Sequence, residues 1–443
     1  MRKRLVVVAV MAIFTALWNT PPASAATAAY IVVLKPTSDV AAAVNKAKGV
    51  GASVSLTYRS ALRGYAANIP TDKVSRIAAD PAVAYVAADK PVSWPTTPDT
   101  CAGHRECQGL PSSLDRIDAD VSSTKSGDGR GSVNANIAII DSGVGPHPDL
   151  NVVGGKSCIP NSTHDDQNGH GTHVAGIAAA IDNSFGVAGA APGARIWSVR
   201  VLSKNGAGSE SRLLCGIDWV ASTRSDADPN NDIQVANMST GAKGSDDGAC
   251  GMLNKDPIHT AVCNVTAKGV FVVAAAGNDG KDLATTTPAA YDEVLTVTSM
   301  NDWDRIPGGL GFPSDAGPFC ADFDAIQFPD DAGTLFSNFA VSPADANRTI
   351  AAPGVCVLST YPGNNYAWIS GTSMASPAVA GIAALCITTG PCAGLTPAQM
   401  VQKLRGDAAA FSSATPSYGF TGDLIRPYPD GRIFGPLARA ALY

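Results

Sequence analysis

The sequence predicts an α/β protein with a mainly parallel sheet and helices on both faces, preceded by a small ferredoxin-like α+β domain. In the larger part, apolar strand-like runs alternate with helical runs, and most of these strands lack the polar alternation of a half-exposed sheet. Strands that are covered on both faces and joined by helices form parallel sheets. In the smaller part, residues 30–92, the element order β-α-β-β-α-β is that of a ferredoxin-like domain.

The composition is that of a globular chain long enough for two or three domains. The 443 residues are 45% hydrophobic and 16% charged, and the formal net charge is −6. No long run of lysine and arginine occurs beyond the first residues, so we expect no nucleic-acid partner. We expect the protein to be a monomer.

The first 25 residues have the three parts of a secretory signal peptide. Met1–Arg4 is basic, Leu5–Trp18 is mostly apolar, and Ala23–Ala25 fits a small-residue cleavage site. The apolar run is short for a membrane span, although an uncleaved anchor is the alternative. We therefore expect cleavage after Ala25, secretion to the extracellular space and no membrane attachment afterwards. No other run approaches membrane-spanning length.

Residues 26–92 are expected to form the small domain. Alternating apolar residues and turn residues predict its strands and helices. Thr71 is expected to cap the second helix, because its hydroxyl can accept a backbone N–H there. The predicted elements are Tyr30–Leu34, Asp39–Lys48, Ser55–Tyr58, Gly64–Ile69, Thr71–Ala79 and Ala82–Val86.

Residues 93–111 are expected to be a linker with a small N-terminal disulfide loop. The segment from Pro91 to Thr100 is rich in proline and threonine, which predicts an extended and exposed chain. Exposed segments of this kind are natural sites of proteolytic nicking.

Residues 112–443 are expected to form the large domain. In open α/β sheets, ligands bind at the carboxyl ends of the strands, so residues that directly follow a strand are candidates for a site. The predicted strands are Ile137–Ile140, Ile196–Leu202, Ile233–Met238, Val270–Ala276 and Val294–Val297, and the predicted helices include His173–Ile181, Ser209–Ser222, Asp256–Lys268, Ala375–Ile387 and Thr396–Arg405.

The ten cysteines predict five disulfides in an oxidising compartment. No C-x-x-C spacing of a metal site occurs. Three close pairs suggest local loops, and the other four cysteines pair most simply in chain order, although the sequence does not fix the connectivity. The suggested pairs are Cys101–Cys107, Cys250–Cys263, Cys386–Cys392, Cys158–Cys215 and Cys320–Cys356.

Ser373 is the first candidate for chemistry. It lies in Gly371–Pro377, between a strand-like run and a helical run rich in alanine and glycine. A serine near a helix N-terminus lies beside unpaired N–H groups and the positive end of the helix dipole. Its hydroxyl could attack a carbonyl carbon while those N–H groups bind the oxyanion. The alternative is a serine that only caps the helix.

Three further residues follow strands or begin a helix in the same domain. Asp141 follows Ile137–Ile140, His170 begins a helical run, and Asn278 follows the strand that starts at Val270. A carboxylate can orient an imidazole, an imidazole can act as base for a serine, and an amide N–H can stabilise an oxyanion. Structural alternatives are a loop cap, a turn, or a zinc pair of His170 with His173. In the order Asp, His, Ser, the residues predict nucleophilic acyl transfer.

Four blocks around these residues resemble the motifs of the subtilisin-like serine proteases, or subtilases. In combination the blocks are highly specific, and the resemblance covers about residues 112–405. The domain at residues 26–92 resembles the family's inhibitor-type propeptide, and the ten cysteines are similar to those of the secreted, proteinase K-like members. The blocks are Ala138–Val144 (AIIDSGV), His170–Gly176 (HGTHVAG), Ala275–Asn278 (AAGN) and Gly371–Pro377 (GTSMASP).

The resemblance implies a secreted serine endopeptidase that is made as a zymogen and inhibited by its own propeptide. Ser373 resembles the nucleophile, His170 the general base, and Asp141 the residue that orients the imidazole. Asn278, with the backbone N–H of Ser373, resembles the oxyanion hole. The alternatives are a non-catalytic interaction protein of the same fold and a peptide ligase that uses the same triad.

The expected partners are peptide or protein substrates held through their main chains. Asn237–Gly241 resembles one edge of the substrate cleft and Ser203–Gly208 the other, which would pair with an extended peptide. A simple turn after a strand is the alternative for the first edge. The predicted substrate-binding residues are Ser239, Thr240, Gly241, Ala275, Ala276 and Gly277, the last four of which would wall a roomy, largely uncharged pocket.

No cofactor is expected for catalysis and no metal ligand is assigned, while structural calcium is left open. The long segment 301–335 is acidic, and we favour a solvated loop tied by a disulfide over a calcium site. Many relatives carry an acidic residue at the position of Thr349 that ligates calcium in some of them, so that site is in doubt here. The acidic residues of the segment include Asp304, Asp315, Asp322 and Asp324.

Overall fold

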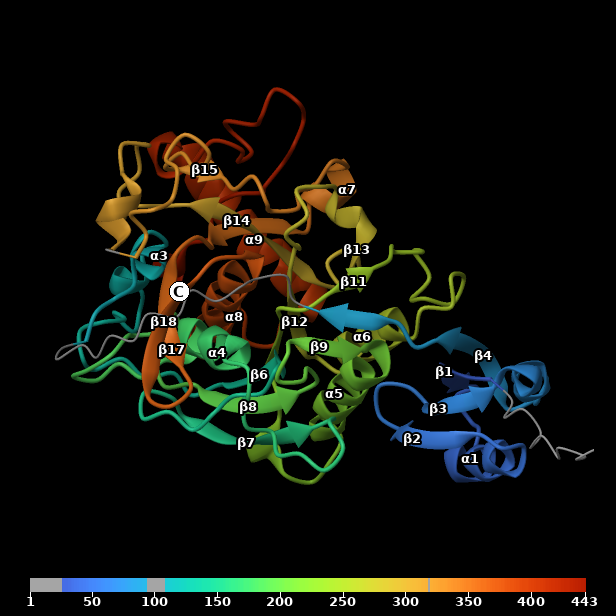
Figure 1. The fold of residues 1–443 in the computed structure, drawn as a ribbon. Coiled ribbons are helices and arrows are strands. Elements are labelled where there is room, and N and C mark those ends of the chain that lie inside the picture. The colour runs from blue at the N-terminus through green and yellow to red at the C-terminus, as the bar shows by residue number, and fades with distance from the viewer. Residues whose placement is uncertain (1–25, 94–107, 318) are drawn as a thin grey trace, which may run out of the picture.

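The computed structural model describes residues 26–93, 108–317 and 319–443. The predicted signal peptide, most of the predicted linker and the suggested Cys101–Cys107 disulfide lie outside the described residues. The chain folds into a small N-terminal domain and a large α/β domain that pack against each other (Figure 1).

The small domain is a four-stranded antiparallel sheet covered by two helices. Its sheet has the order β2-β3-β1-β4, which confirms the ferredoxin-like prediction. Asp39 caps the first helix by accepting the backbone N–H of Ala41 at 2.8 Å. The elements are β1 (Thr27–Leu34), α1 (Val40–Gly49), β2 (Ser53–Tyr58), β3 (Gly64–Pro70), α2 (Val74–Ala78) and β4 (Val83–Ala88).

The prediction that Thr71 caps the second helix is wrong. Thr71 begins a 3₁₀ turn, Thr71–Lys73, and α2 starts after it without any side-chain cap. The backbone N–H of Thr71 instead donates to the carbonyl of Ala26 at 2.9 Å, which extends the strand pairing by one residue. Pairing across the sheet therefore outweighs the local capping preference at this position.

The large domain is built on a mainly parallel sheet of eight strands. The order is β15-β14-β12-β10-β6-β8-β7, with β16 also paired to β14, and the short β15 is antiparallel to β14. The strands are β6 (Asn136–Asp141), β7 (Val152–Ser157), β8 (Arg195–Arg200), β10 (Val235–Met238), β12 (Phe271–Ala275), β14 (Leu295–Asn301), β15 (Ala332–Gly333) and β16 (Thr349–Pro353).

Helices cover both faces of this sheet, as the sequence predicts. Along β6, Ile137 and Ile139 belong to the core under α4 and α8, whereas Ala138 and Ile140 belong to the core under α5 and α6. This alternation within one apolar run is what a strand buried on both faces requires. The helices are α4 (His170–Ala179), α5 (Glu210–Thr223), α6 (Pro257–Ala267), α8 (Thr372–Thr389) and α9 (Pro397–Ala414), with the short α3 (Ser112–Asp115) and α7 (Pro343–Ala346).

Helix α8 crosses the interior of the large domain. By length and hydropathy it is the one described helix that could cross a membrane. This corrects the expectation that no such run follows the signal peptide. However, 83% of the helix is buried inside the protein. Its small residues allow close packing, because a Cβ on Gly381 would lie 2.7 Å from the Cβ of Ala190 and 2.8 Å from the carbonyl of Ala178. The apolar length of α8 is thus that of a core helix.

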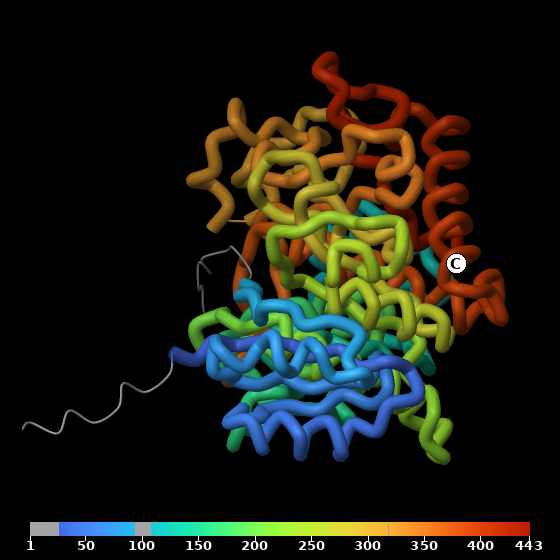
Figure 2. Tube along the Cα trace, turned by 90° about the vertical axis from the view of Figure 1, so that its right-hand side faces the viewer, coloured from blue at the N-terminus to red at the C-terminus, as the bar shows by residue number. Residues whose placement is uncertain are grey.

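Short antiparallel pairs complete the large domain. The hairpin of β17 (Val357–Tyr361) and β18 (Asn365–Ile369) packs on α4, and β11 (Ala242–Lys243) pairs with β13 (Thr286–Thr287). The strand-like run expected before Gly371 is β18, whereas its partner β17 and the glycine-containing β7 were not predicted, because their apolar alternation is short. Figures 1 and 2 show the small domain (blue) beside α5 and α6, where its side chains join their core.

The segment predicted as an exposed linker begins as a strand. Pro91–Ser93 forms β5, antiparallel to β9 (Ala207–Ser209), and Val92 is only 2% exposed. The prediction of an exposed chain fails here because the large domain offers unpaired backbone groups to an extended segment. After the undescribed stretch, Gly109 already donates to the carbonyl of Gly186 at 2.9 Å, so the large domain begins before residue 112.

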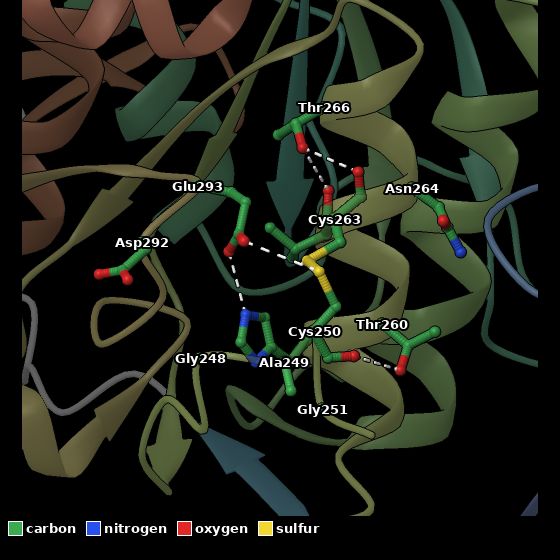
Figure 3. Close-up of a disulfide and its surroundings, with 12 residues drawn as sticks. Gly248, Ala249, Cys250, Gly251, Thr260, Cys263, Asn264, Thr266, Asp292 and Glu293 are labelled. Carbon is green, nitrogen blue, oxygen red and sulfur yellow. Dashed lines mark hydrogen bonds and ion pairs between the residues drawn. A yellow bond between two sulfur atoms is a disulfide. The ribbon is translucent and has the colours of Figure 1, made fainter. Parts of the chain in front are cut away.

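Four disulfides lie in the described residues, and they are the pairs that the spacing suggested. In Figure 3, one of them ties α6 to the loop before it, beside Glu293 at the start of β14. Thr260 strengthens the same corner by donating to the carbonyl of Cys250 at 2.7 Å. The bonds are Cys158–Cys215, Cys250–Cys263, Cys320–Cys356 and Cys386–Cys392.

Candidate active site

Asp141 and His170 form a buried pair where β6 ends and α4 begins. The Nδ1 atom of His170 lies 2.8 Å from Oδ1 of Asp141, and neither residue is exposed. The backbone N–H of Ser142 also donates to this oxygen, at 2.6 Å. Gly171 lets the two elements approach, because a Cβ there would lie 2.1 Å from the carbonyl of Gly143. Since a carboxylate can only accept, the bond places the proton on Nδ1 of the neutral ring.

Asp166 holds the start of α4 against the end of β6. Its carboxylate accepts the backbone N–H groups of Gly169 and Thr172, each at 2.9 Å, as an acidic group does at a helix N-terminus. It also accepts the hydroxyl of Ser142, which in turn accepts the N–H of Gly171. The sequence analysis missed this residue. An aspartate four residues before a helix-starting histidine was the signal that could have found it.

Ser373 is the second residue of α8 and is 2% exposed. Its Oγ atom lies 3.3 Å from the carbonyl oxygen of Ser239, and the hydroxyl of Ser239 donates to the carbonyl of Ser373 at 3.0 Å. One turn further on, the hydroxyl of Ser376 donates to Oδ1 of Asn237 at 2.6 Å. The first turn of α8 is therefore fixed to the carboxyl end of β10.

Asn278 lies beyond the end of β12, next to the start of α8. Its Oδ1 accepts the backbone N–H of Thr372 at 2.9 Å and the hydroxyl of the same residue at 2.8 Å. Its Nδ2 is shielded from solvent and has no hydrogen-bond partner among the described residues. The side chain is thus held by its oxygen, with a buried N–H₂ donor beside the start of α8.

Ser373 and Asn278 border a cavity of about 430 Å³, whereas Asp141 and His170 are not among the residues that line it. Of the predicted substrate-binding residues, Ala276 does not line it: the residue is fully buried and its carbonyl accepts Nδ2 of Asn338 at 2.9 Å. The prediction of a largely uncharged pocket also needs correction, since Lys281 and Asp279 line it as an ion pair at 2.8 Å. The lining residues include Ser239, Thr240, Gly241, Ala275, Gly277, Asn278, Thr286, Thr372 and Ser373, with Lys243.

The two predicted edges of the cleft hold a segment of the chain itself. Ser93 donates to the carbonyl of Gly241 and accepts its N–H, both at 3.3 Å, while β5 pairs with β9 on the other side. These contacts use only backbone groups, so they place no demand on side chains. An extended chain is thus bound between the edges.

Charged groups on α5 bind the small domain to the large one. Asp218 accepts the backbone N–H groups of Arg59, Ser60 and Ala61, the last at 2.6 Å. At the start of the same helix, Asp89 accepts the backbone N–H of Ser211 at 2.9 Å and so caps α5 from the other domain.

His173 lies one turn along α4 from His170 but faces the hairpin. It is fully buried, and its Nε2 lies 3.0 Å from the carbonyl of Val357 and 2.9 Å from that of Ala367. Burial lowers the pKa of this imidazole to about 3. The ring therefore serves as a neutral donor that docks the β17–β18 hairpin, and the zinc pair with His170 is not formed.

Three groups of side chains among the described residues have a spacing that could hold a metal ion: Cys250, Cys263 and Glu293; Asp246, His259 and Glu293; and Asp302, Asp304 and Asp330. The two cysteines of the first group are bonded to each other, which leaves the other two groups as candidates. Neither group lines the cavity, and of the acidic residues expected in segment 301–335, Asp304 is the one that joins such a group. Thr349 supplies no carboxylate, and the guanidinium of neighbouring Arg348 donates to nearby backbone carbonyls.

A paired Asp and His, a serine at a helix start and a buried amide donor together define a serine hydrolase type of site. The subtilase family model matches residues 133–421, and the peptidase inhibitor I9 model matches residues 29–94. The chain belongs to the subtilase family of serine proteases and carries an inhibitor domain of the I9 kind.

Several curated proteases are similar to this chain. Subtilisin E of Bacillus subtilis is 32% identical over 371 residues, which are 82% of this chain and 81% of the relative. The alkaline protease of Alkalihalobacillus alcalophilus is 34% identical over 315 residues, and the match spans 71% of this chain and 66% of that protein. Subtilisin Savinase of Lederbergia lenta is 35% identical over 279 residues, covering 63% of this chain and 84% of its own length.

Stability against acid is expected to depend on His173. Because its folded pKa is about 3 and its unfolded pKa about 6.5, only the unfolded state binds this proton as the pH falls between those values. This residue therefore lowers the free energy of unfolding by up to about 1.4 kcal/mol per pH unit below about pH 6.5, and it contributes no pH dependence above that value.

Denaturant unfolding at about pH 7.5 and about pH 5 checks this, and His173→Gln should lose about 2 kcal/mol less than wild type between them. All samples carry Ser373→Ala to prevent self-digestion. His164→Gln is the control, because the ring of His164 is about one-third exposed. Parallel pH curves for wild type and His173→Gln would contradict the assignment.

Proposed function

We propose that this chain is a secreted serine endopeptidase made as a zymogen. The observation that carries the proposal is the buried Asp141–His170 bond at the start of α4, together with a serine at the start of the adjacent helix α8 and a shielded amide donor. Family membership and the inhibitor domain support the same reading. The signal-like residues 1–25 and the four disulfides support export to an oxidising compartment, as in proteinase K-like members.

The reaction follows from the arrangement of the four groups. His170 accepts the hydroxyl proton of Ser373 while Oγ bonds to the substrate carbonyl carbon, and Asp141 stabilises the imidazolium. The carbonyl oxygen of the substrate becomes negative and accepts hydrogen bonds from Nδ2–H of Asn278 and from the backbone N–H of Ser373. The C–N bond then breaks as His170 returns the proton to the leaving amine. Water, activated by the same imidazole, hydrolyses the acyl-enzyme.

Substrate peptides take the place that β5 occupies in the zymogen. Both edges bind main-chain groups, which favours broad substrate acceptance. The Asp279–Lys281 pair and Lys243 at the cavity give it a charged rim, so side-chain preference is set there as well as by the apolar wall.

The residues 26–93 act as a tethered inhibitor until the chain is cut after β5. A tethered strand has a high effective concentration in the cleft, which keeps the precursor inactive. The stretch 94–111 follows directly from the cleft-bound strand and is rich in proline and threonine, so the maturation cut is expected within it.

Ser373→Ala should abolish both self-processing and peptide hydrolysis. Refolded wild-type precursor should release a fragment that ends near residues 93–111, whereas the variant should stay full length, because alanine has no oxygen with which to attack the carbonyl carbon. Mass spectrometry of the precursor and of a peptide panel measures both results. Self-cleavage of the pure variant would contradict the mechanism, and joined rather than hydrolysed peptides from wild type would assign a ligase.

Asn278→Ala should lower kcat by about 10²–10³, the usual cost in this family of removing one oxyanion donor, with little change in KM. The donor contacts charge that exists only in the transition state, so ground-state binding is spared. Steady-state kinetics on one peptide amide give both constants. Asn338→Ala, which removes an amide that supports the same loop, is the comparison expected to lower the Tm. If Asn278→Ala instead raises KM by the same factor by which it lowers kcat/KM, with kcat unchanged, the residue has a binding role.

Asp218→Ala should shorten the lag before activity appears after self-cleavage. The carboxylate receives three backbone N–H groups of the small domain, so its loss should weaken inhibition by about 10–100-fold. Progress curves with a fluorogenic peptide measure the lag. Asp226→Ala, an exposed carboxylate just beyond α5, is the matched control. An unchanged lag would show that Asp218 does not hold the inhibitor.

A further inference from the structure

Three aspartates gather beyond the carboxyl end of β14. Asp302 and Asp304 flank the buried Trp303, and Asp330 approaches from the far end of the loop that Cys320 ties down. One carboxylate oxygen from each aspartate lies within 4.8 Å of the other two. None of the three lines the active-site cavity.

Asp302 leaves a carboxylate oxygen without a partner in the protein interior. Its side chain is fully buried, and Oδ2 has no hydrogen-bond partner among the described residues. Oδ1 accepts the backbone N–H of Arg305 at 3.2 Å and lies 3.6 Å from Nε of Arg116. A buried carboxylate oxygen is costly to leave unsatisfied, so this atom indicates a missing ligand.

The surrounding charges do not balance. The adjacent Asp331 takes the same Arg116 guanidinium in a closer contact of 2.8 Å, and the side chain of Arg305 turns to Asp115 at 3.5 Å. Four carboxylates with one guanidinium therefore need either a proton or a further cation.

We propose that Asp302, Asp304 and Asp330 bind a Ca²⁺ ion. The donors are all carboxylate oxygens, which select a hard cation rather than zinc or copper. Two oxygens bound to one Ca²⁺ at about 2.3–2.6 Å can be up to about 5 Å apart, so these three can share an ion. Bound calcium would cross-link the end of β14 to the disulfide loop and stabilise the large domain. The inference concerns stability and does not rest on the proposed function.

The competing explanation is a shared proton on the same carboxylates. Terbium distinguishes the two, because Tb³⁺ replaces Ca²⁺ and its luminescence is excited through a nearby indole. Trp303 lies between two of the proposed ligands. Full-length Ser373→Ala precursor, freed of metal with chelator, should show Tb³⁺ luminescence on tryptophan excitation, and Ca²⁺ should displace it. Saturating Ca²⁺ should raise the Tm by about 5 °C.

Asp304→Asn is the sharpest variant, because Asp304 is partly exposed and makes no ion pair with Arg116 that its loss would break. It should weaken Tb³⁺ and Ca²⁺ binding at this site at least tenfold, yet keep or raise the Tm in chelator by relieving repulsion. Asp302→Asn should abolish the Tb³⁺ signal. Asp322→Asn, an exposed residue of the same loop, should bind as the parent does.

Two results would overturn the proposal. The first is an absence of indole-excited Tb³⁺ luminescence together with a Tm that Ca²⁺ does not raise, which would favour the shared proton. The second is a Ca²⁺ response that Asp302→Asn and Asp304→Asn retain in full, which would place the ion elsewhere, for example at Asp246, His259 and Glu293. Peptide hydrolysis by wild type is a separate measurement, so failure here leaves the proposed function standing.

Discussion

The buried hydrogen bond between Asp141 and His170 is the interaction on which the rest of the site depends. A carboxylate in the interior is costly unless it is paired and hydrogen-bonded. Asp141 is held through Oδ1 alone, which accepts from the imidazole Nδ1 and from one backbone N–H, while its Oδ2 has no hydrogen-bond partner among the described residues. Because Asp141 ends β6 and His170 starts α4, satisfying one charge also fixes a helix against the sheet. Asp166 and Gly171 serve the same junction, one by capping α4 and the other by leaving space.

The second requirement is that α8, which carries Ser373 in its first turn, packs closely against α4, the helix that His170 begins. Small residues meet it along the whole helix: a side chain at Gly381 would collide with the segment after α4. At the first turn, polar groups replace apolar packing, and Ser239 and Asn278 hold the backbone there. The cost of burying a polar helix start is thus offset by hydrogen bonds to the ends of two neighbouring strands. Because α8 runs through the core, its residues are apolar along its length, and its first turn needs polar partners for its backbone groups.

Much of this was predictable because it depends on local pattern. Apolar runs without polar alternation predicted the parallel strands, and Asp141 and Asn278 were proposed as site residues from their places after such runs. The features that were missed depend on contacts between distant segments. Asp302 and Asp330 are 28 positions apart in the chain, and only the folded loop brings their oxygens together. The pairing of β5 depends on backbone groups of β9 and Gly241, which are far from it in the sequence. Ala276 is buried away from the cavity, and its carbonyl accepts a hydrogen bond from Nδ2 of Asn338.

In the inhibitor domain, the contacts that bind the large domain outside the cleft are distinct from the strand β5 that blocks the cleft. Outside the cleft the domain contacts α5, which receives Asp89 at its first turn and offers Asp218 to a loop of the small domain, and α6, where Asn264 donates to the carbonyl of Ala61. Only β5 enters the cleft, and it does so through backbone groups that any substrate also has. Cutting the chain after β5 therefore removes the tether without removing the contacts on α5, so the cut alone does not open the cleft. Release requires the small domain to leave α5, and the charges that hold it there set how long the mature enzyme stays inhibited.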